Sequence, residues 1–176
     1  HLVLGDRARR VLAEPLLGDA RAPSNPLAAH IPLIVGTNTA EFVNGVDNAS
    51  ANLFTVDQLE SSARMELGEN ARKIVDCYRR IYPNESAFGL HSIISAWWMR
   101  RLAVDQLEAK RRQGGVAYGY LFNWAAPAME ERIATYHACE IAYAFDNAEL
   151  CINQTGGGPV AGRVASIAAA AFGPVV

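Results

Sequence analysis

The sequence predicts an α/β protein with two parallel strands and several packing helices. Two short segments rich in β-branched and aromatic residues, IPLIVG at 31–36 and VAYGYLFNW at 116–124, are separated by a long stretch of helical periodicity. The first segment is apolar without alternation, which predicts a strand buried on both faces, as in a parallel sheet. The composition, 51% hydrophobic and 19% charged, is that of a globular protein.

Two helices are expected between the strands, over residues 55–82. Thr55 and Gln58 form the capping-box pattern that starts many helices, so the first helix is expected to follow Thr55. The second spans residues 69–82, where apolar residues recur at helical spacing up to Pro83. The side chains expected to face its core are Ala71, Ile74, Val75, Tyr78, Ile81 and Tyr82.

Two further helices are expected, one before and one after the second strand. The earlier is a single long helix over 91–112, ended by Gly114 and Gly115. The later follows TGGGP at 155–159 and has Pro159 in its first turn, where the missing N–H is not needed. The expected core-facing side chains are Ile94, Trp97, Trp98, Leu102 and Leu107 in the earlier helix, and Val160, Val164, Ile167, Ala168 and Ala171 in the later one.

Two parallel strands by themselves leave both sheet edges exposed, which predicts further strands outside this chain. The chain begins at His1 rather than Met, and residues 1–30 are typical of a connecting loop. We therefore expect residues 1–176 to be part of a larger single domain whose other strands are missing. The sheet is expected to pair with that missing part or with a second copy of the chain.

The charge and cysteine patterns exclude several classes of protein. A net charge of -2 without a basic patch argues against nucleic-acid binding, and no apolar run approaches the ~18 residues of a membrane span. Cys77, Cys139 and Cys151 include no CxxC pair, which excludes a zinc ribbon. Their odd number predicts reduced, mostly buried thiols, as in a cytoplasmic protein.

Two residues that can carry chemistry follow the predicted strands. Glu41 follows the first strand in GTNTAEF, and His137 follows the second in YHACE. Loops that leave the carboxyl ends of neighbouring parallel strands meet at one edge of the sheet, so the carboxylate and the imidazole can come together. A carboxylate on one ring nitrogen fixes the tautomer and stabilises the imidazolium that forms when the other nitrogen takes a proton. The pattern predicts a general base and its orienter.

From the residues alone, this interpretation has competitors. A single histidine is more often a core or surface residue, and a single glutamate after a strand is often solvated. A third possibility is that His137 and Glu140, three residues apart, are ligands of a metal ion. Tyr136 and the segment AYAF at 142–145 indicate a buried, non-helical environment, which disfavours a metal site.

Four segments, in the same order, resemble the type-B carboxylesterases, the cholinesterase and para-nitrobenzyl esterase family of α/β-hydrolases. They are IPLIVGTNTAEF, VAYGYLFNW, ATYHACEIAYAFDN and GGGPVAGRVASIAAAAF. In that family they correspond to the acid strand and loop, a later strand, the catalytic-histidine segment and the C-terminal helix. The resemblance covers nearly the whole chain and implies the C-terminal part of an α/β-hydrolase fold. It also implies a Ser-Glu-His triad in the chain order nucleophile, acid, base.

The resemblance implies a role for individual residues. Glu41 matches the triad acid, and His137 matches the triad base. Glu140 matches a glutamate that we expect to be structural. Phe42 stands where the family often has Gly, and we expect it to line the substrate pocket. Ala40 replaces the family's Asp before the acid.

No residue of this chain matches the family's nucleophile. The elbow G-E-S-A-G and the HGGG oxyanion loop both lie upstream of the acid in the family, and neither occurs here. The only similar segment is NESAF at 84–88, where Asn84 and Phe88 replace the glycines that the tight turn requires. Ser86 is therefore rejected as the nucleophile.

The resemblance implies a serine-type carboxylic ester hydrolase that acts on small-molecule esters through an acyl-enzyme, without a metal or organic cofactor. Because the chain holds the acid and the base but no nucleophile, we expect it to be inactive alone. The alternative is a non-catalytic, cholinesterase-like binding or scaffold protein. Retention of both Glu41 and His137 disfavours that alternative.

Overall fold

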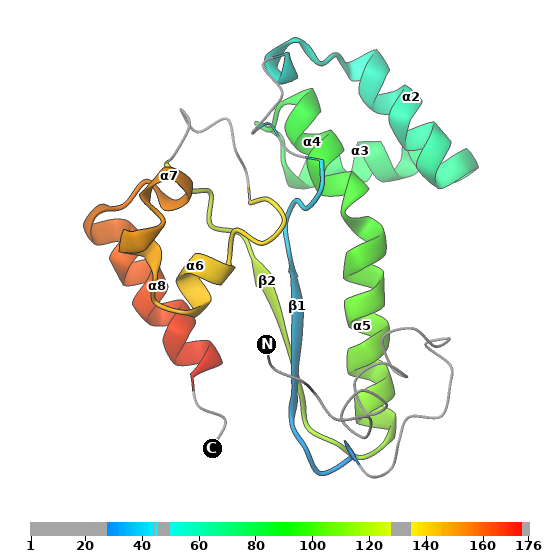
Figure 1. Ribbon diagram of the computed structural model, residues 1–176. Helices are drawn as coiled ribbons and strands as arrows, with labels where there is room; N and C mark the ends of the chain where they lie inside the picture. The colour runs from blue at the N-terminus through cyan, green and yellow to red at the C-terminus, as the bar shows by residue number, and fades with distance from the viewer. Residues whose placement is uncertain (1–27, 44, 46–49, 128–134, 174–176) are drawn as a thin grey trace, which may run out of the picture. The chain divides into compact units, whose positions relative to one another are not determined.

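The structure, a computed structural model, describes residues 28–43, 45, 50–127 and 135–173 (Figure 1). Almost all of the expected connecting loop over 1–30 lies outside the described residues. Within them, helices and strands are mixed, and two strands pair in one sheet. This arrangement is compatible with the predicted α/β class.

The chain divides into two compact units. The first comprises His1–Thr37 and Trp98–Leu121, and the second comprises Asn38–Trp97 and Phe122–Val176. The first unit therefore contains most of both strands. The second contains every residue that the sequence marks as a candidate for chemistry.

The two expected strands are both present, as β1 (Leu33–Asn38) and β2 (Ala117–Phe122). The Leu33 N–H donates to the Val116 carbonyl (3.0 Å), and the Thr39 N–H donates to the Phe122 carbonyl (2.9 Å). The strands therefore run in the same direction and lie side by side (Figure 1), which confirms the predicted parallel pairing.

The prediction that the strand at 31–36 is buried on both faces is wrong for the described chain. β1 is only half-buried as far as Gly36, and Tyr118 and Leu121 of β2 are exposed. Among the described residues no third strand pairs with these two, so part of the sheet stays open to solvent. Gly36 is required by the pairing, because a Cβ there would collide with the carbonyl oxygen and the ring of Tyr120.

The single helix expected over 91–112 is two helices, α4 (Ala87–Ser95) and α5 (Trp97–Arg112), with Ala96 between them. The expected helix is therefore interrupted at Ala96. Ile94 is buried as expected, and Leu107 lies near Gly119 of β2. Three of the expected core residues are exposed instead: Trp97, Trp98 and Leu102.

In the second unit, the expected first helix is α2 (Val56–Leu67), preceded by the short helix η2 (Ala51–Leu53). The Thr55 hydroxyl accepts a hydrogen bond from the Gln58 N–H (3.2 Å), and the Gln58 side chain accepts one from the Thr55 N–H (2.8 Å). The predicted capping box is confirmed. A cap of this kind stabilises a helix by about 1 kcal/mol.

The next expected helix is α3 (Ala71–Ile81), which follows the short helix η3 (Gly68–Asn70). Its inward face packs with α2 and α4 around a buried cluster, and Tyr78 and Tyr82 pack against it from the edge. Ile81 is exposed, contrary to expectation, because the helix ends there. The buried members of the cluster are Leu59, Ala63, Ala71, Val75, Leu90 and Ile94.

A second buried cluster joins the end of β2 to the C-terminal helices (Figure 1). The C-terminal helices are α6 (Ile141–Ala144), η5 (Ala148–Leu150), α7 (Ile152–Thr155) and α8 (Gly158–Phe172), and the cluster contains residues of α6, η5 and α8. Tyr143 of α6 is fully buried there, and its hydroxyl accepts a hydrogen bond from the Trp124 indole N–H (3.1 Å).

Helix α8 has Pro159 in its first turn, as predicted, and part of its expected core face is buried. Ala161 and Ala165 are buried, and Val164 and Ala168, two of the expected residues, pack against the same cluster. Val160 is exposed and Ile167 is 71% exposed, contrary to expectation. The small Ala161 and Ala165 side chains allow α8 to pack closely in this cluster.

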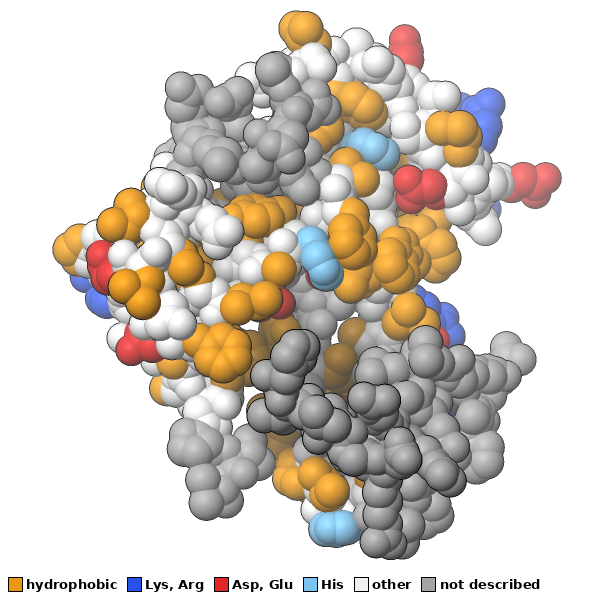
Figure 2. Space-filling view, in the orientation of Figure 1, with side chains coloured by type: hydrophobic (Ala, Val, Ile, Leu, Met, Phe, Trp, Pro, Cys, Tyr) orange, Lys and Arg blue, Asp and Glu red, His pale blue; other side chains and the backbone are white. Residues whose placement is uncertain are grey.

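Hydrophobic side chains are common on the surface of the described chain (Figure 2). None of the helices in the described ranges combines the length and apolar character that crossing a membrane requires. The three cysteines are free, with Cys139 buried, Cys151 half-buried and Cys77 exposed. The expectation of mostly buried thiols is therefore wrong for Cys77, which lies on the outer face of α3.

Candidate active site

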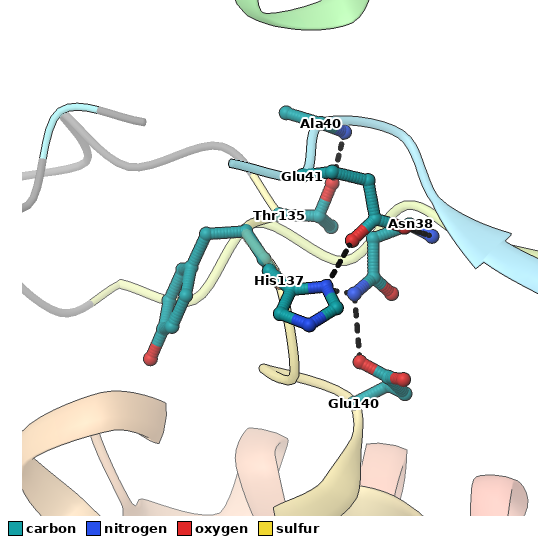
Figure 3. Close-up of polar contacts among 7 residues, drawn as sticks. Asn38, Ala40, Glu41, Thr135, His137 and Glu140 are labelled. Carbon is teal, nitrogen blue, oxygen red and sulfur yellow. Dashed lines mark hydrogen bonds and ion pairs between the residues drawn. The ribbon is translucent and has the colours of Figure 1, made fainter. Parts of the chain in front are cut away.

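Glu41 and His137 meet in the second unit, between the loop after β1 and the turn before α6 (Figure 3). Oε2 of Glu41 lies 2.9 Å from Nδ1 of His137. The two residues are far apart in the chain, and they meet where the order of strands and loops led us to expect. Because a carboxylate accepts hydrogen bonds, the pair favours the tautomer with its proton on Nδ1.

The Glu41 carboxylate is held in a buried position. Its side chain is 4% exposed, and its Oε1 accepts a hydrogen bond from the Asn38 N–H (2.8 Å). Each carboxylate oxygen thus has a donor, which offsets part of the cost of burying the group. A carboxylate fixed in this way cannot swing out to solvent, so it presents Oε2 to the imidazole in one orientation.

Backbone bonds tie the loop of Glu41 to the segment of His137. The His137 N–H donates to the Glu41 carbonyl (3.1 Å), and the Ala40 N–H donates to the Thr135 hydroxyl (3.0 Å). Ala40, Glu41 and Thr135 are all buried. The spacing between acid and imidazole is therefore set by the backbone as well as by the side chains.

A tight turn follows the histidine. Ala138 has φ 69°, a left-handed conformation that costs roughly 1–2 kcal/mol for a residue with a Cβ. The Cys139 N–H closes the turn on the Tyr136 carbonyl (3.0 Å). Strained backbone of this kind is often found at functional sites. This conformation was not predictable, because nothing in YHACE marks Ala138 as unusual.

The other face of the His137 ring is open. The side chain is 48% exposed, and Nε2 has no hydrogen-bond partner among the residues that the structure describes. The Phe42 ring lies against the imidazole, with 4.2 Å between centroids and a tilt of 33°. Phe42, expected to line a substrate pocket, thus contacts the imidazole directly and is itself exposed. The arrangement leaves Nε2 able to take a proton from an incoming group.

Glu140 and Asn38 form a second polar pair below the histidine (Figure 3). Nδ2 of Asn38 donates to Oε2 of Glu140 (2.7 Å). Nothing in the described ranges gathers three or more His, Cys, Asp or Glu side chains into a group able to hold a metal. Asn38 was not predicted as a site residue, although an Asn at the end of an apolar strand, in GTN, is a visible signal.

Ser86 has a structural place in the chain. It is the N-cap of α4, and its Oγ accepts a hydrogen bond from the Gly89 N–H (2.9 Å). Such a cap is the ordinary use of a serine before a helix. The described structure gives Ser86 no contact with His137.

The buried thiol nearest to the histidine is unreactive by its environment. Burial raises the pKa of Cys139 to about 12. A thiol with that pKa is neutral at pH 7 and is a poor nucleophile. Cys139 is therefore a buried residue of the turn and a poor candidate for a nucleophile beside His137.

Comparison with known proteins gives no match of either kind: no family model matches the chain, and no curated protein matches it. The family and the function of the chain are therefore proposals that rest on its residues and on the geometry of the site.

Proposed function

We propose that the chain is the acid-and-base portion of a carboxylic ester hydrolase of the serine type, built on an α/β-hydrolase fold. His137 is the general base, and Glu41 orients it. The observation that carries the proposal is the pairing of a buried, fully hydrogen-bonded carboxylate with Nδ1 of a histidine whose Nε2 is open. The resemblance of four segments to the type-B carboxylesterases agrees with these roles.

In the proposed reaction, a serine hydroxyl from outside this chain bonds to the ester carbonyl carbon, and Nε2 of His137 takes its proton. Glu41 stabilises the imidazolium. Nε2 then returns the proton to the leaving alcohol as the C–O bond breaks, which leaves an acyl-enzyme. Water attacks the acyl-enzyme by the same steps, and the carboxylic acid departs with the serine restored.

The exposed Phe42 ring supports an apolar substrate group beside the base. It lies on the imidazole and faces solvent, so an apolar acyl or alcohol group can pack on it while the ester carbonyl lies near Nε2. The substrate class is therefore a small carboxylic ester with at least one apolar group. No cofactor takes part in this proposal.

The test compares the 176-residue chain with the product of the complete open reading frame of its gene. We expect the chain alone to show no turnover of a p-nitrophenyl ester and no labelling by a fluorophosphonate probe. The complete product is expected to hydrolyse the ester and to be labelled on one serine. Changing His137→Gln should abolish turnover, whereas the exposed His30→Gln should not. A complete product that neither hydrolyses the ester nor takes the label refutes the proposal.

A further inference from the structure

Asn38 ends β1 with a buried side chain, 1% exposed, that links both ends of the histidine turn. Its Nδ2 donates to the Tyr136 carbonyl (2.9 Å), just before His137, and to Oε2 of Glu140 (2.7 Å), just after the turn. Its backbone N–H donates to Oε1 of Glu41 (2.8 Å). One residue thus holds the carboxylate and both sides of the imidazole (Figure 3).

Asn38 is an unfavourable residue for packing alone. Its Oδ1 is buried and has no hydrogen-bond partner within the described part of the chain. A buried oxygen without a donor carries a free-energy penalty that an apolar side chain of similar size avoids. Both donors of the same amide are used, however, and both bonds go to the histidine turn. The side chain is thus specialised for holding that turn.

The turn itself needs such an anchor. Ala138 is in the strained left-handed conformation (φ 69°), so the turn gains by relaxing unless its ends are fixed. Glu140 fixes the far end, because it is the N-cap of α6 and its carbonyl accepts a hydrogen bond from the N–H of Ala144, the last residue of that helix (2.8 Å). The bond from Asn38 to the Glu140 carboxylate connects this end to β1.

We propose that Asn38 is a positioning residue that keeps the His137 ring in register with Glu41. It acts through the Tyr136 carbonyl and the Glu140 carboxylate, and it does not touch the substrate. Its consequence for catalysis rests on the proposed function. The positioning itself can be measured without turnover, from the Nδ1–H of His137.

The test exchanges donor and acceptor between positions 38 and 140. Asn38→Asp keeps the size of the side chain but sets a carboxylate oxygen against the Tyr136 carbonyl and the Glu140 carboxylate. Glu140→Gln keeps an oxygen that accepts from Asn38, so this variant should behave like the wild type. In the double variant, the new amide at position 140 donates to the new carboxylate at position 38, and one of the two lost bonds returns.

Two readouts are expected to agree. In Asn38→Asp, the proton NMR signal of the His137 Nδ1–H should disappear through exchange. In the complete gene product, kcat for a p-nitrophenyl ester should fall about 10²-fold with little change in KM, because a misplacement near 1 Å is enough for such a loss. The double variant should recover about tenfold in kcat, equivalent to a coupling of about 1.4 kcal/mol.

Controls separate positioning from general loss of stability. Leu59→Ala opens a cavity in the cluster of α2, α3 and α4 and destabilises the fold without touching the site, so it should keep the Nδ1–H signal. Asn84→Asp makes the same chemical change at an exposed position and should have no effect. If Asn38→Asp fails to fold, Glu140→Ala removes one of the two bonds from its half-buried end and should lower kcat about tenfold, with a weaker Nδ1–H signal.

The proposal is overturned if Asn38→Asp keeps the signal and kcat, if Leu59→Ala loses them equally, or if the double variant shows no recovery. Failure of the proposed function gives a different result, namely a wild-type gene product that does not hydrolyse esters. In that case the NMR comparison of Asn38→Asp, Leu59→Ala and the double variant still decides whether Asn38 positions His137.

Discussion

Replacing the Glu41 carboxylate by an amide should move the proton of His137 from one ring nitrogen to the other. In Glu41→Gln, one side-chain atom faces the Asn38 N–H and the other faces Nδ1 of His137, at the present distances of 2.8 and 2.9 Å. The backbone N–H can only donate, so the amide oxygen must turn toward Asn38. The amide NH₂ then faces Nδ1, which must become an acceptor, and the ring proton moves to Nε2.

The size of the effect follows from these contacts. A hydrogen bond to a charged group contributes about 1.5–3 kcal/mol and a neutral one about 0.5–1.5 kcal/mol, so the change at the buried Asn38 N–H costs about 1 kcal/mol. The His137 side is discounted, because that ring is 48% exposed. Glu41→Ala leaves the Asn38 N–H without a partner and should cost more, about 2 kcal/mol. In the complete gene product, the wrong tautomer should lower kcat about 10⁴-fold.

Long-range ¹H–¹⁵N correlation spectra of histidine-labelled chain at pH 9 report the tautomer directly, and the His137→Gln variant assigns the signals. Urea unfolding gives the free energies. The matched control is Glu108→Gln, because Glu108 is an exposed carboxylate paired with Arg112 at 3.5 Å. It should change stability by less than about 0.5 kcal/mol and leave every histidine tautomer as it was. A Glu41→Gln spectrum that still shows the proton on Nδ1 refutes the orienting role of Glu41.

Three further outcomes are expected. Ala138→Gly should stabilise the chain by about 0.5–1 kcal/mol in urea unfolding, because glycine adopts φ 69° without strain. The control Ala170→Gly, on the exposed face of α8, should destabilise the chain by about 1 kcal/mol. A loss of stability in both variants contradicts the strain at Ala138. In the native chain at pH 8, the exposed Cys77 should react with a thiol reagent long before the buried Cys139. Burial raises the pKa of Cys139 from 9.0 to about 12, so its thiolate is about 10³-fold rarer than that of an ordinary thiol. Equal reaction rates contradict the burial of Cys139. Burial lowers the pKa of His91 below 6.5, so the stability contributed by its neutral ring is fully present above about pH 6.5 and is lost as the pH falls through the lower folded-state pKa. His91→Phe should flatten the dependence of the unfolding free energy on pH in this range. An unchanged pH dependence contradicts the contribution of His91.

Local chemistry made part of the fold predictable. Thr55 and Gln58 specify a helix start by hydrogen bonds between near neighbours, and Pro83 follows the end of α3 because it cannot continue a helix. The parallel pairing of β1 and β2 was also predictable, since two strands joined through intervening helices favour that direction. These features depend on a few residues or on chain order, and a sequence contains both.

The errors concern surfaces that depend on distant partners. Hydrophobicity predicted that Val160 and Ile167 face the core, but α6 lies close to α8 and selects Ala161 and Ala165. The periodicity of residues 91–112 did not predict the break at Ala96, and Trp98 after it is exposed. Close approach and helix breaks are properties of the folded chain, and no periodicity within one segment specifies them.

For the site, the sequence predicted the approach of Glu41 and His137 but not the residues that fix it. Loop positions after two parallel strands are enough to bring the pair together. The roles of Asn38, Thr135 and Ala138 depend on which atoms face one another across the two segments, and that information appears only in the folded chain. Asn38 was the nearest to being predictable, as a polar residue at the end of an apolar strand.

The fold holds His137 and Glu41, the proposed base and its orienter, in a fixed arrangement. The bonds from the Asn38 N–H to Glu41, from the His137 N–H to the Glu41 carbonyl and from the Ala40 N–H to Thr135 use backbone donors, which cannot rotate away. A serine brought to Nε2 therefore meets an imidazole whose orientation is already fixed, and little ordering cost remains for the reaction itself. The left-handed Ala138 and the unsatisfied Oδ1 of Asn38 are costs of that arrangement, and a turn folded for stability alone has no reason to keep either. Their presence on both sides of one histidine is the physical reason to regard His137 as a functional residue.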